Sequence, residues 1–516
     1  MRAALCLVFV ACATAAPKPE PAPAAPAKPP PTEADLLRPK VAALEQKAAA
    51  VEAIRDDALW SFWLGGAPST ADLWPPELLD DAALKDLRRA RELKAYDPIT
   101  LDRLEALIAG ERVGRAMRET EATIANLEAS SRFPFEKGDV ALRDLGSLLA
   151  NEKNAARRQA LWAASLPAVK QLDAALAKRD EAQREALAAV QLGPESFAAL
   201  LRGADLTALA TFADRFLLAT EERWRARLAA LKVQSRADLP AVLKPSGTLD
   251  AAFPKARIAE RGTALLASLG LYGLPQLTLD LTDSPRKQPL PLTVSGVRLS
   301  FKPRGGWKDQ QSLFAELGRA LTLRHAPHAR RRTVETSAAL FGSLAWNRAW
   351  LEEQNIAATE PLALGPDIQL LALRRAAGAL IADLDRAYAL PDDPARIRPD
   401  AEALQAGAVT LRAATSAFAL ARHLETECGP RWWSSLKASE ILKAFWQTGE
   451  LPEPVRAPGE SGEALLSALG SQVWEKHNER NPLAACRIIV HHATNCQTRR
   501  EPGAGTGRQV HHRCRR

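Results

Sequence analysis

Helical periodicity runs through most of this sequence and limits what the chain can fold into more than any other feature. From residue 33 to about residue 272, apolar residues recur at three- and four-residue steps, as in "DLLRPKVAALEQKAAAV" and "DRLEALIAGERVGRAM". Pro and Gly mark the joins between these stretches, and no repeat of fixed length is evident, so a solenoid is not expected. The pattern predicts a mostly α protein.

One region departs from this pattern. Around residues 276–302 apolar and polar residues alternate, as in "QLTLDLTD" and "PLTVSGVRLSFK", which predicts a small β element. Helical periodicity resumes with "WKDQQSLFAELGRALTLRH" and continues to about residue 469. We therefore expect one helical domain over residues 34–470, with an N-terminal half at 34–272 and a second half at 273–470.

The N-terminus has the features of an export signal. Residues 1–16 contain one Arg, an apolar run too short to cross a bilayer and several small residues. Two processing sites are open: "ATAA" before Pro17 suits cleavage by a signal peptidase, whereas "FVAC" resembles a lipobox and makes Cys12 a lipidation candidate. Residues 17–33 read as a Pro/Ala-rich linker. The expected location is the periplasm or, through lipidated Cys12, the membrane surface of a bacterial envelope.

The C-terminal segment differs from the rest in composition. Residues 471–516 hold nine Lys or Arg and three Asp or Glu, which leaves 60 basic and 58 acidic residues for the remaining chain. The body is therefore nearly neutral, and the net charge of +8 gives no support for nucleic-acid binding. The segment also holds five of the eight His, with no zinc-finger spacing, and we expect a disordered or out-of-frame tail.

The stretch "AELGR", from Ala315 to Arg319, is two substitutions away from a zinc-peptidase motif. In an H-E-x-x-H helix the two imidazoles lie one turn apart and bind the same zinc ion, while the Glu acts as general base. Here Glu316 and Gly318 fit the motif, but Ala315 has no ligand atom, and the guanidinium of Arg319 has no lone pair to donate.

The surrounding segments resemble those of one peptidase family in their order along the chain and in their sequence motifs. "PRGGW" precedes the helix, "VETSAALF" (Val334–Phe341) follows it, and "GPRWW" and "ILKAFWQTG" come later. Together with "NEKNAARRQALWAAS", these are similar to the helical gluzincin metallopeptidases of the oligoendopeptidase, thimet-oligopeptidase and angiotensin-converting-enzyme type, over roughly residues 35–470. The resemblance implies a two-lobed helical architecture with a deep central cleft.

The same resemblance assigns roles to individual positions. A phrase like V-T-E-x-x-A-x-L-F in the family carries the third zinc ligand, which falls on Glu335. A phrase like F-Y-x-A-R-Y supplies cleft residues that help hold the reaction intermediate, and it matches Phe418, Ala419, Arg422 and His423, with Ala and His at the tyrosine positions. Ala315, Arg319 and Glu335 are thus degenerate zinc-ligand positions, and Glu316 is a retained general-base position that we expect to be inactive.

Loss of the metal predicts a different arrangement of charge. Without a dication, Glu316 and Glu335 would be two carboxylates close together, which raises the pKa of at least one. Our hypothesis is that Arg319 is a fixed cation that pairs with both by charge-assisted hydrogen bonds. No zinc or other cofactor is then expected, because one remaining carboxylate ligand is a weak metal site.

Other candidate residues are better explained by their structural surroundings than by a metal-binding or ligand-binding site. His325 and His328 in "RHAPHARRR" are imaginable as relocated ligands, but their spacing does not suit the Glu316 face, so we expect a basic solvated loop. Trp432, Trp433 and Trp446 are expected to pack between helices.

These inferences predict an exported pseudopeptidase that binds peptides or a protein partner in its cleft. Two alternatives remain open at this point. One is a divergent zinc metallopeptidase that cleaves oligopeptides, and the other is a helical scaffold of the cell envelope.

Overall fold

The structure is a computed structural model that describes residues 30–64, 73–202, 205–271, 278–281, 292–294, 298–326, 331–390 and 401–451. The predicted signal with Cys12, the tail at 471–516, His328 and nearly all of the 17–33 linker lie outside these residues. Among them, no helix is both long enough and apolar enough to cross a membrane.

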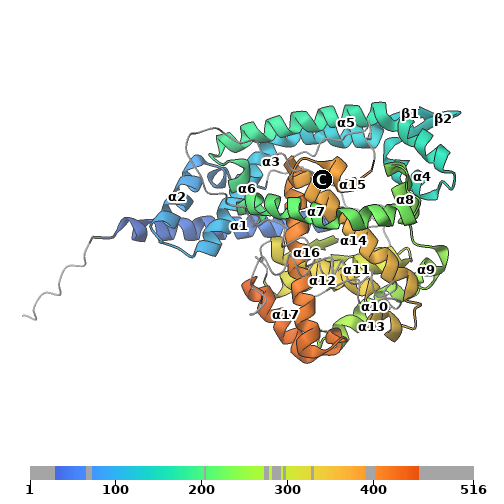
Figure 1. Cartoon of the computed structure of the whole chain (residues 1–516). Helices are drawn as coiled ribbons and strands as arrows, with labels where there is room; N and C mark the ends of the chain where they lie inside the picture. The colour runs from blue at the N-terminus through green and yellow to red at the C-terminus, as the bar shows by residue number, and fades with distance from the viewer. Residues whose placement is uncertain are drawn as a thin grey trace, which may run out of the picture.

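The predicted mostly α architecture is confirmed (Figure 1). The first part of the chain is built from long helices whose starts are fixed by side-chain caps: Thr32 and Asp35 form a capping box, and Asp97 and Asn154 cap later helices. Its helices are α1 (Glu33–Trp63), α2 (Asp81–Glu92), α3 (Pro98–Ser130), α4 (Leu145–Asn151), α5 (Ala155–Ala189), α6 (Pro194–Arg202) and α7 (Leu206–Ala230).

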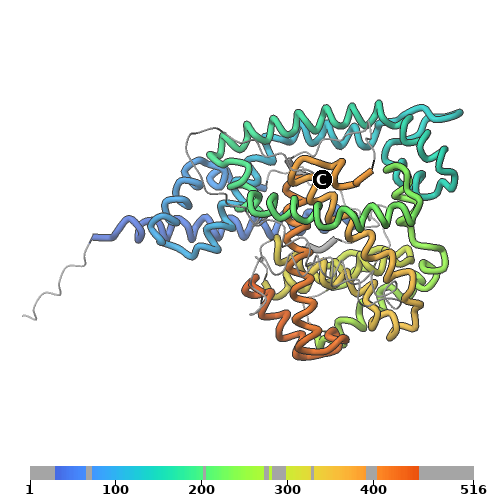
Figure 2. Tube along the Cα trace, viewed as in Figure 1, coloured from blue at the N-terminus to red at the C-terminus, as the bar shows by residue number. Residues whose placement is uncertain are grey.

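The rest of the chain forms a second set of helices, most of which lie in the lower body in Figure 1. They are α8 (Leu239–Val242), α9 (Gly247–Ala251), α10 (Lys255–Ser268), α11 (Trp307–His325), α12 (Arg331–Gly342), α13 (Arg348–Glu353), α14 (Thr359–Leu380), α15 (Leu384–Tyr388), α16 (Ala401–Cys428) and α17 (Leu436–Thr448). Figure 2 shows α3 and α5 running side by side along one edge of the molecule, above this body.

Two small sheets interrupt the helices. The predicted β element is present as β3 (Thr278–Asp280), β4 (Leu292–Val294) and β5 (Arg298–Ser300), in the order β3-β5-β4, with β3 parallel and β4 antiparallel to β5. The second sheet is a hairpin of β1 (Arg132–Phe135) and β2 (Gly138–Ala141). The sequence had predicted only helix there. The hairpin forms because Phe133 is buried with Leu145 and Leu161 in a cluster of its own.

The hydrophobic clusters divide the chain at a different point from the predicted boundary at residue 272. One cluster joins α1, α2, α3 and α6 with the end of α5. Helix α7 instead packs with α14, α15 and α16, and α9 and α10 share the largest cluster with α11–α13, α16 and α17. Helices α7, α9 and α10 therefore pack with the C-terminal half, whereas Ala237 belongs to a cluster with Phe133 and Leu161 of the first half. As predicted, Trp432, Trp433 and Trp446 are buried between helices of that half.

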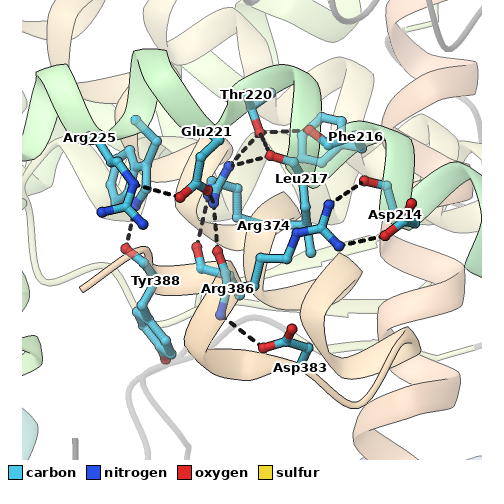
Figure 3. A network of polar contacts seen from close by, with 12 residues as sticks. Asp214, Phe216, Leu217, Thr220, Glu221, Arg225, Arg374, Asp383, Arg386 and Tyr388 are labelled. Carbon is cyan, nitrogen blue, oxygen red and sulfur yellow. Dashed lines mark hydrogen bonds and ion pairs between the residues drawn. The ribbon is translucent and has the colours of Figure 1, made fainter. Parts of the chain in front are cut away.

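A buried arginine ties α7, α14 and α15 together (Figure 3). Arg374 on α14 has no exposed surface, and all three nitrogens of its guanidinium donate hydrogen bonds. The acceptors are Ala387 O at 2.8 Å, Leu217 O at 3.1 Å, Thr220 Oγ1 at 2.6 Å, Glu221 Oε2 at 2.6 Å and Arg386 O at 2.6 Å. Because these acceptors come from helices far apart in the sequence, Arg374 fixes how the three elements dock.

Candidate functional site

The turn before α11 fixes where that helix begins. Gly305 and Gly306 have φ values of 98° and 99°, a region that residues with a side chain rarely adopt. The carboxylate of Asp309 accepts hydrogen bonds from the backbone N–H groups of Arg304 and Gly305, at 2.5 and 2.9 Å. Asp250 accepts one from the N–H of Trp307 at 2.9 Å. The "PRGGW" stretch therefore anchors the first turn of α11.

Helices α11 and α12 cross at very short distance. A Cβ atom placed on Gly318 would lie 2.4 Å from the carbonyl oxygen of Ser337, so only glycine fits at this point of the crossing. The hydroxyl of Ser337 also meets Thr322 Oγ1 at 2.7 Å and accepts a hydrogen bond from Trp446 Nε1 at 2.9 Å. The crossing places Ala315, one turn before Gly318, beside Gly342 at the end of α12, and it places Arg319 beside Glu335 nearer the start of α12.

Four charged side chains meet beside this crossing, and we call Glu316, Arg319, Glu335 and Arg331 the charge cluster. Arg319 Nη1 pairs with Glu316, and its Nη2 and Nε lie 2.8 and 3.2 Å from Glu335 Oε2. Arg331 Nη2 lies 2.7 Å from Glu335 Oε1. Two arginines and two glutamates thus alternate, and the cluster has no net charge.

The cluster is partly shielded from water. The side chains of Glu316 and Glu335 are 11% and 15% exposed, and that of Arg319 is 28% exposed. Burial disfavours the charged guanidinium of Arg319, but attraction to Glu316 and the hydrogen bonds to Glu335 outweigh this effect and raise its pKa above the ordinary arginine value. Arg319 therefore remains a cation between two carboxylates, which is the arrangement that the sequence hypothesis requires.

The residues at the predicted zinc-ligand positions do not fit a zinc ion. The methyl group of Ala315 faces α12, where it lies 3.4 Å from the position that a Cβ on Gly342 would take. The guanidinium of Arg319 lies between the carboxylates and has no lone pair with which to bind a metal. The described residues contain no group of three or more His, Cys, Asp and Glu side chains placed to hold a metal ion.

The four predicted cleft residues are not brought to the charge cluster by polar contacts. Phe418 packs against the cluster of α7, α14 and α16, and Ala419 is buried. Arg422 is exposed, and His423 is half-buried near Glu427, on the same helix. None of the four makes a hydrogen bond or ion pair with Glu316, Arg319 or Glu335 in the described part of the chain.

The predicted solvated loop after α11 is wrong for His325 and Arg331. His325 is the last residue of α11, and its ring stacks on Trp446 with centroids 5.0 Å apart. Arg331 begins α12, where its side chain lies one helical turn from Glu335. The i, i+4 spacing of Arg331 and Glu335 was visible in the sequence, but the run of neighbouring arginines concealed which one would pair.

A cavity of about 450 Å³ lies to one side of the charge cluster. Its wall comes from α1, α3, α6, the segment around Trp74 and, through Arg331, the start of α12. The family resemblance implied a deep central cleft, whereas this cavity lies among the helices of the first half and meets the charge cluster only at Arg331.

Comparisons with known proteins find matches among solved structures and none by sequence. No family model and no curated protein matches this sequence. Among solved structures, a putative oligoendopeptidase F from Bacillus anthracis str. Ames aligns with a TM-score of 0.49 and 12% sequence identity, over 85% of this chain and 96% of that chain.

Proposed function

We propose that this protein is a peptidase-like binding protein in which an arginine occupies the position of a catalytic metal. The observation that carries the proposal is the pairing of Arg319 with Glu316 and Glu335 across the crossing of α11 and α12. It is supported by the sequence context, which resembles the zinc helix and the third-ligand helix of the gluzincin peptidases on these same two elements.

The charge cluster is unsuited to metal-dependent hydrolysis for a chemical reason. Zinc peptidases need three protein ligands that leave one position for a water molecule. Of the three predicted ligand positions, only Glu335 still carries a side chain that can bind a metal. Both of its carboxylate oxygens already pair with arginines. Glu316 is likewise bound to Arg319, so it is not free to take a proton from water. We propose that the protein binds peptides or a protein segment without cleaving them.

Metal analysis of a designed set of variants tests this proposal. We expect the wild-type chain to purify without stoichiometric zinc, and the Ala315→His/Arg319→His variant to take up about one zinc per chain, because positions 315 and 319 lie one helical turn apart and position 319 lies beside Glu335. Gly342 has no side chain that would block a larger residue at position 315. Adding Glu335→Ala to the double variant should abolish the uptake.

A matched control separates this site from any pair of histidines on a helix. Gly114 and Arg118 on α3 are exposed and have the same i, i+4 spacing, and Gly114 has open space where a Cβ would be. The Gly114→His/Arg118→His variant should bind zinc far more weakly, because it has only two ligands. One zinc per wild-type chain that is lost on Glu335→Ala would overturn the proposal in favour of a divergent metallopeptidase, as would chelator-sensitive peptide cleavage.

The proposal includes export from the cytoplasm, supported by the composition of residues 1–16. Mass spectrometry of the mature protein from bacterial cells tests it. A chain that begins at Pro17 or at a lipidated Cys12 would support export, and the second result would add attachment to a membrane. A chain that retains residues 1–16 would contradict it.

A further inference from the structure

The cavity beside the charge cluster combines an apolar wall with an available positive charge. It lies between α1, α3, α6 and the first residue of α12. Ile99, at the start of α3, has 59% of its surface exposed, and it lines the cavity together with Trp74, Leu107 and Leu201. A single exposed isoleucine is ordinary, but one that lines a cavity together with an aromatic side chain would lose exposed apolar area when a ligand binds.

The acidic side chains of the cavity already have partners. Glu52 pairs with Arg103 at 2.7 Å, Asp102 with Arg91 at 2.9 Å, and Glu111 with Arg115 at 2.8 Å. Each of these carboxylates is therefore neutralised by an arginine of the first half. They leave no excess of negative charge in the cavity to repel an anion.

Two further arginines at the cavity have donors available. Arg55 on α1 is exposed and makes no ion pair with any residue that the structure describes. Arg331 contacts Glu335 through Nη2, and its side chain is 58% exposed. A guanidinium has five N–H donors, so Arg331 can keep its bond to Glu335 and still receive a second acceptor.

We propose that this cavity binds the C-terminal end of a short peptide, with the free carboxylate at Arg55 and Arg331 and an apolar last side chain against Ile99 and Trp74. This inference rests on the proposed peptide-binding function and names the part of the ligand that is recognised. Arginine binds a carboxylate through two parallel hydrogen bonds, which suits a terminal carboxylate better than a backbone amide. The volume of about 450 Å³ is within the usual range for small-ligand sites.

The position of Arg331 connects this cavity to the charge cluster. Its guanidinium lines the cavity and pairs with Glu335, which in turn pairs with Arg319. A peptide whose carboxylate lies at Arg331 would thus have its end one ion pair away from the zinc-ligand position. The fixed charges of the cluster hold Arg331 in place without a metal.

Calorimetric titration of the full chain with two peptides tests the inference. The probes are N-acetyl-Ala-Ala-Leu with a free carboxylate and the same peptide with a C-terminal amide. We expect the acid to bind at least about tenfold more tightly, because the amide loses a charge-assisted interaction. Arg55→Gln should weaken binding of the acid and narrow its advantage over the amide, whereas Arg118→Gln, an exposed arginine of α3 outside the cavity, should leave both affinities unchanged.

A second variant tests the apolar wall. Ile99→Asn keeps the net charge and should remove the preference for a peptide ending in Leu over one ending in Gly. Equal binding of acid and amide, no change on Arg55→Gln, or no binding of either peptide would overturn the cavity assignment. If the free-acid peptide binds equally well to the Arg55→Gln variant, the cavity assignment fails but the proposed peptide-binding function stands. The zinc measurement on the wild-type chain tests separately whether the protein lacks a catalytic metal.

Discussion

Two arginines in this protein are held in opposite ways. Arg374 is fully buried, and its acceptors are mainly backbone carbonyls, with one carboxylate. Arg319 is partly exposed, and the acceptors the structure gives it are carboxylates. Burial, the largest cause, lowers the pKa of Arg374, whereas the pairing at Arg319 outweighs burial and raises its pKa. Arg374 is thus a connector of helices, and Arg319 is a counter-charge for two glutamates.

The largest effect should follow from removing the connector. Arg374→Ala leaves buried carbonyls and Glu221 without their donor, and we expect a loss of about 3–5 kcal/mol in the free energy of unfolding. Chemical denaturation followed by circular dichroism measures it. Arg225→Ala serves as a control, since Arg225 also pairs with Glu221 but is 64% exposed, and it should change stability little. Similar losses in the two variants would remove the distinction between the buried and the exposed arginine.

The helix crossing can be disturbed without changing any charge. In Gly318→Ala the new Cβ would overlap the carbonyl of Ser337, so the helices must separate, and we expect a loss of about 2–3 kcal/mol. Gly114→Ala on α3, where the added Cβ meets nothing within 4 Å, should instead stabilise the protein by up to about 1 kcal/mol. Thermal unfolding of the pair measures both. A stable Gly318→Ala variant would show that the crossing tolerates a wider spacing.

Removing the counter-charge should have a smaller effect that depends on pH. Arg319→Ala leaves Glu316 and Glu335 as neighbouring carboxylates, and we expect a loss of about 1–2 kcal/mol near neutral pH, because the site is partly exposed. The repulsion raises the pKa of one glutamate in the folded state, so the folded variant binds a proton more readily than the unfolded chain. The loss should therefore shrink as the pH falls from about 8 to about 5.

The pH dependence of unfolding can also be measured in a variant that has no charge at positions 316, 319 and 335. In Glu316→Gln/Arg319→Met/Glu335→Gln no carboxylate remains to be repelled, and the loss should be smaller and independent of pH over that range. A loss in Arg319→Ala that does not vary with pH would mean that Arg319 acts through packing alone.

The smallest expected effect concerns His325, at the end of α11. Burial, followed by the charges of Lys443 and Arg324, lowers the pKa of His325 in the folded state. The unfolded chain then binds more protons, so the stability from this group is present above the unfolded pKa of about 6.5 and is lost as the pH falls below it. We expect less than about 1 kcal/mol, because the ring is only partly buried.

Unfolding measured at several pH values tests this expectation. His325→Gln should remove that part of the pH dependence, whereas His423→Gln, on α16, should preserve it. An unchanged pH profile in His325→Gln would contradict the assignment. The pH dependence at His325 bears on the helix crossing, because His325 stacks on Trp446. The indole N–H of Trp446 in turn donates a hydrogen bond to Ser337 at the crossing.

Much of the fold could be predicted from local pattern, and so could three of the four residues of the charge cluster, whereas the pairing of Arg331 was missed. Helices of this length show their periodicity and capping residues in the sequence. Glu316, Arg319 and Glu335 lie within recognisable sequence motifs. The hairpin at β1 and β2 could not, because its strands are four residues each and owe their stability to burial of Phe133 under α5. Short strands carry too few residues for alternation to stand out.

The connector and the cavity were beyond prediction for another reason. Arg374 meets Glu221, which is 153 residues away, and the chain has 69 Lys and Arg residues from which to choose. The cavity similarly joins α1 and α3 to the first residue of α12, more than 200 residues later. Such pairings are set by how the helices dock, which single-sequence periodicity does not contain.

The contact at Gly318 has a consequence for anyone who would redesign this protein. Because the backbones meet at Gly318 and Ser337, the close approach of α11 and α12 at that point does not rest on the side chains at positions 319 and 335. The two helices form a scaffold that can carry different side chains. New ligand sets, for metals or for anions, can be introduced at those two positions without rebuilding the scaffold around them.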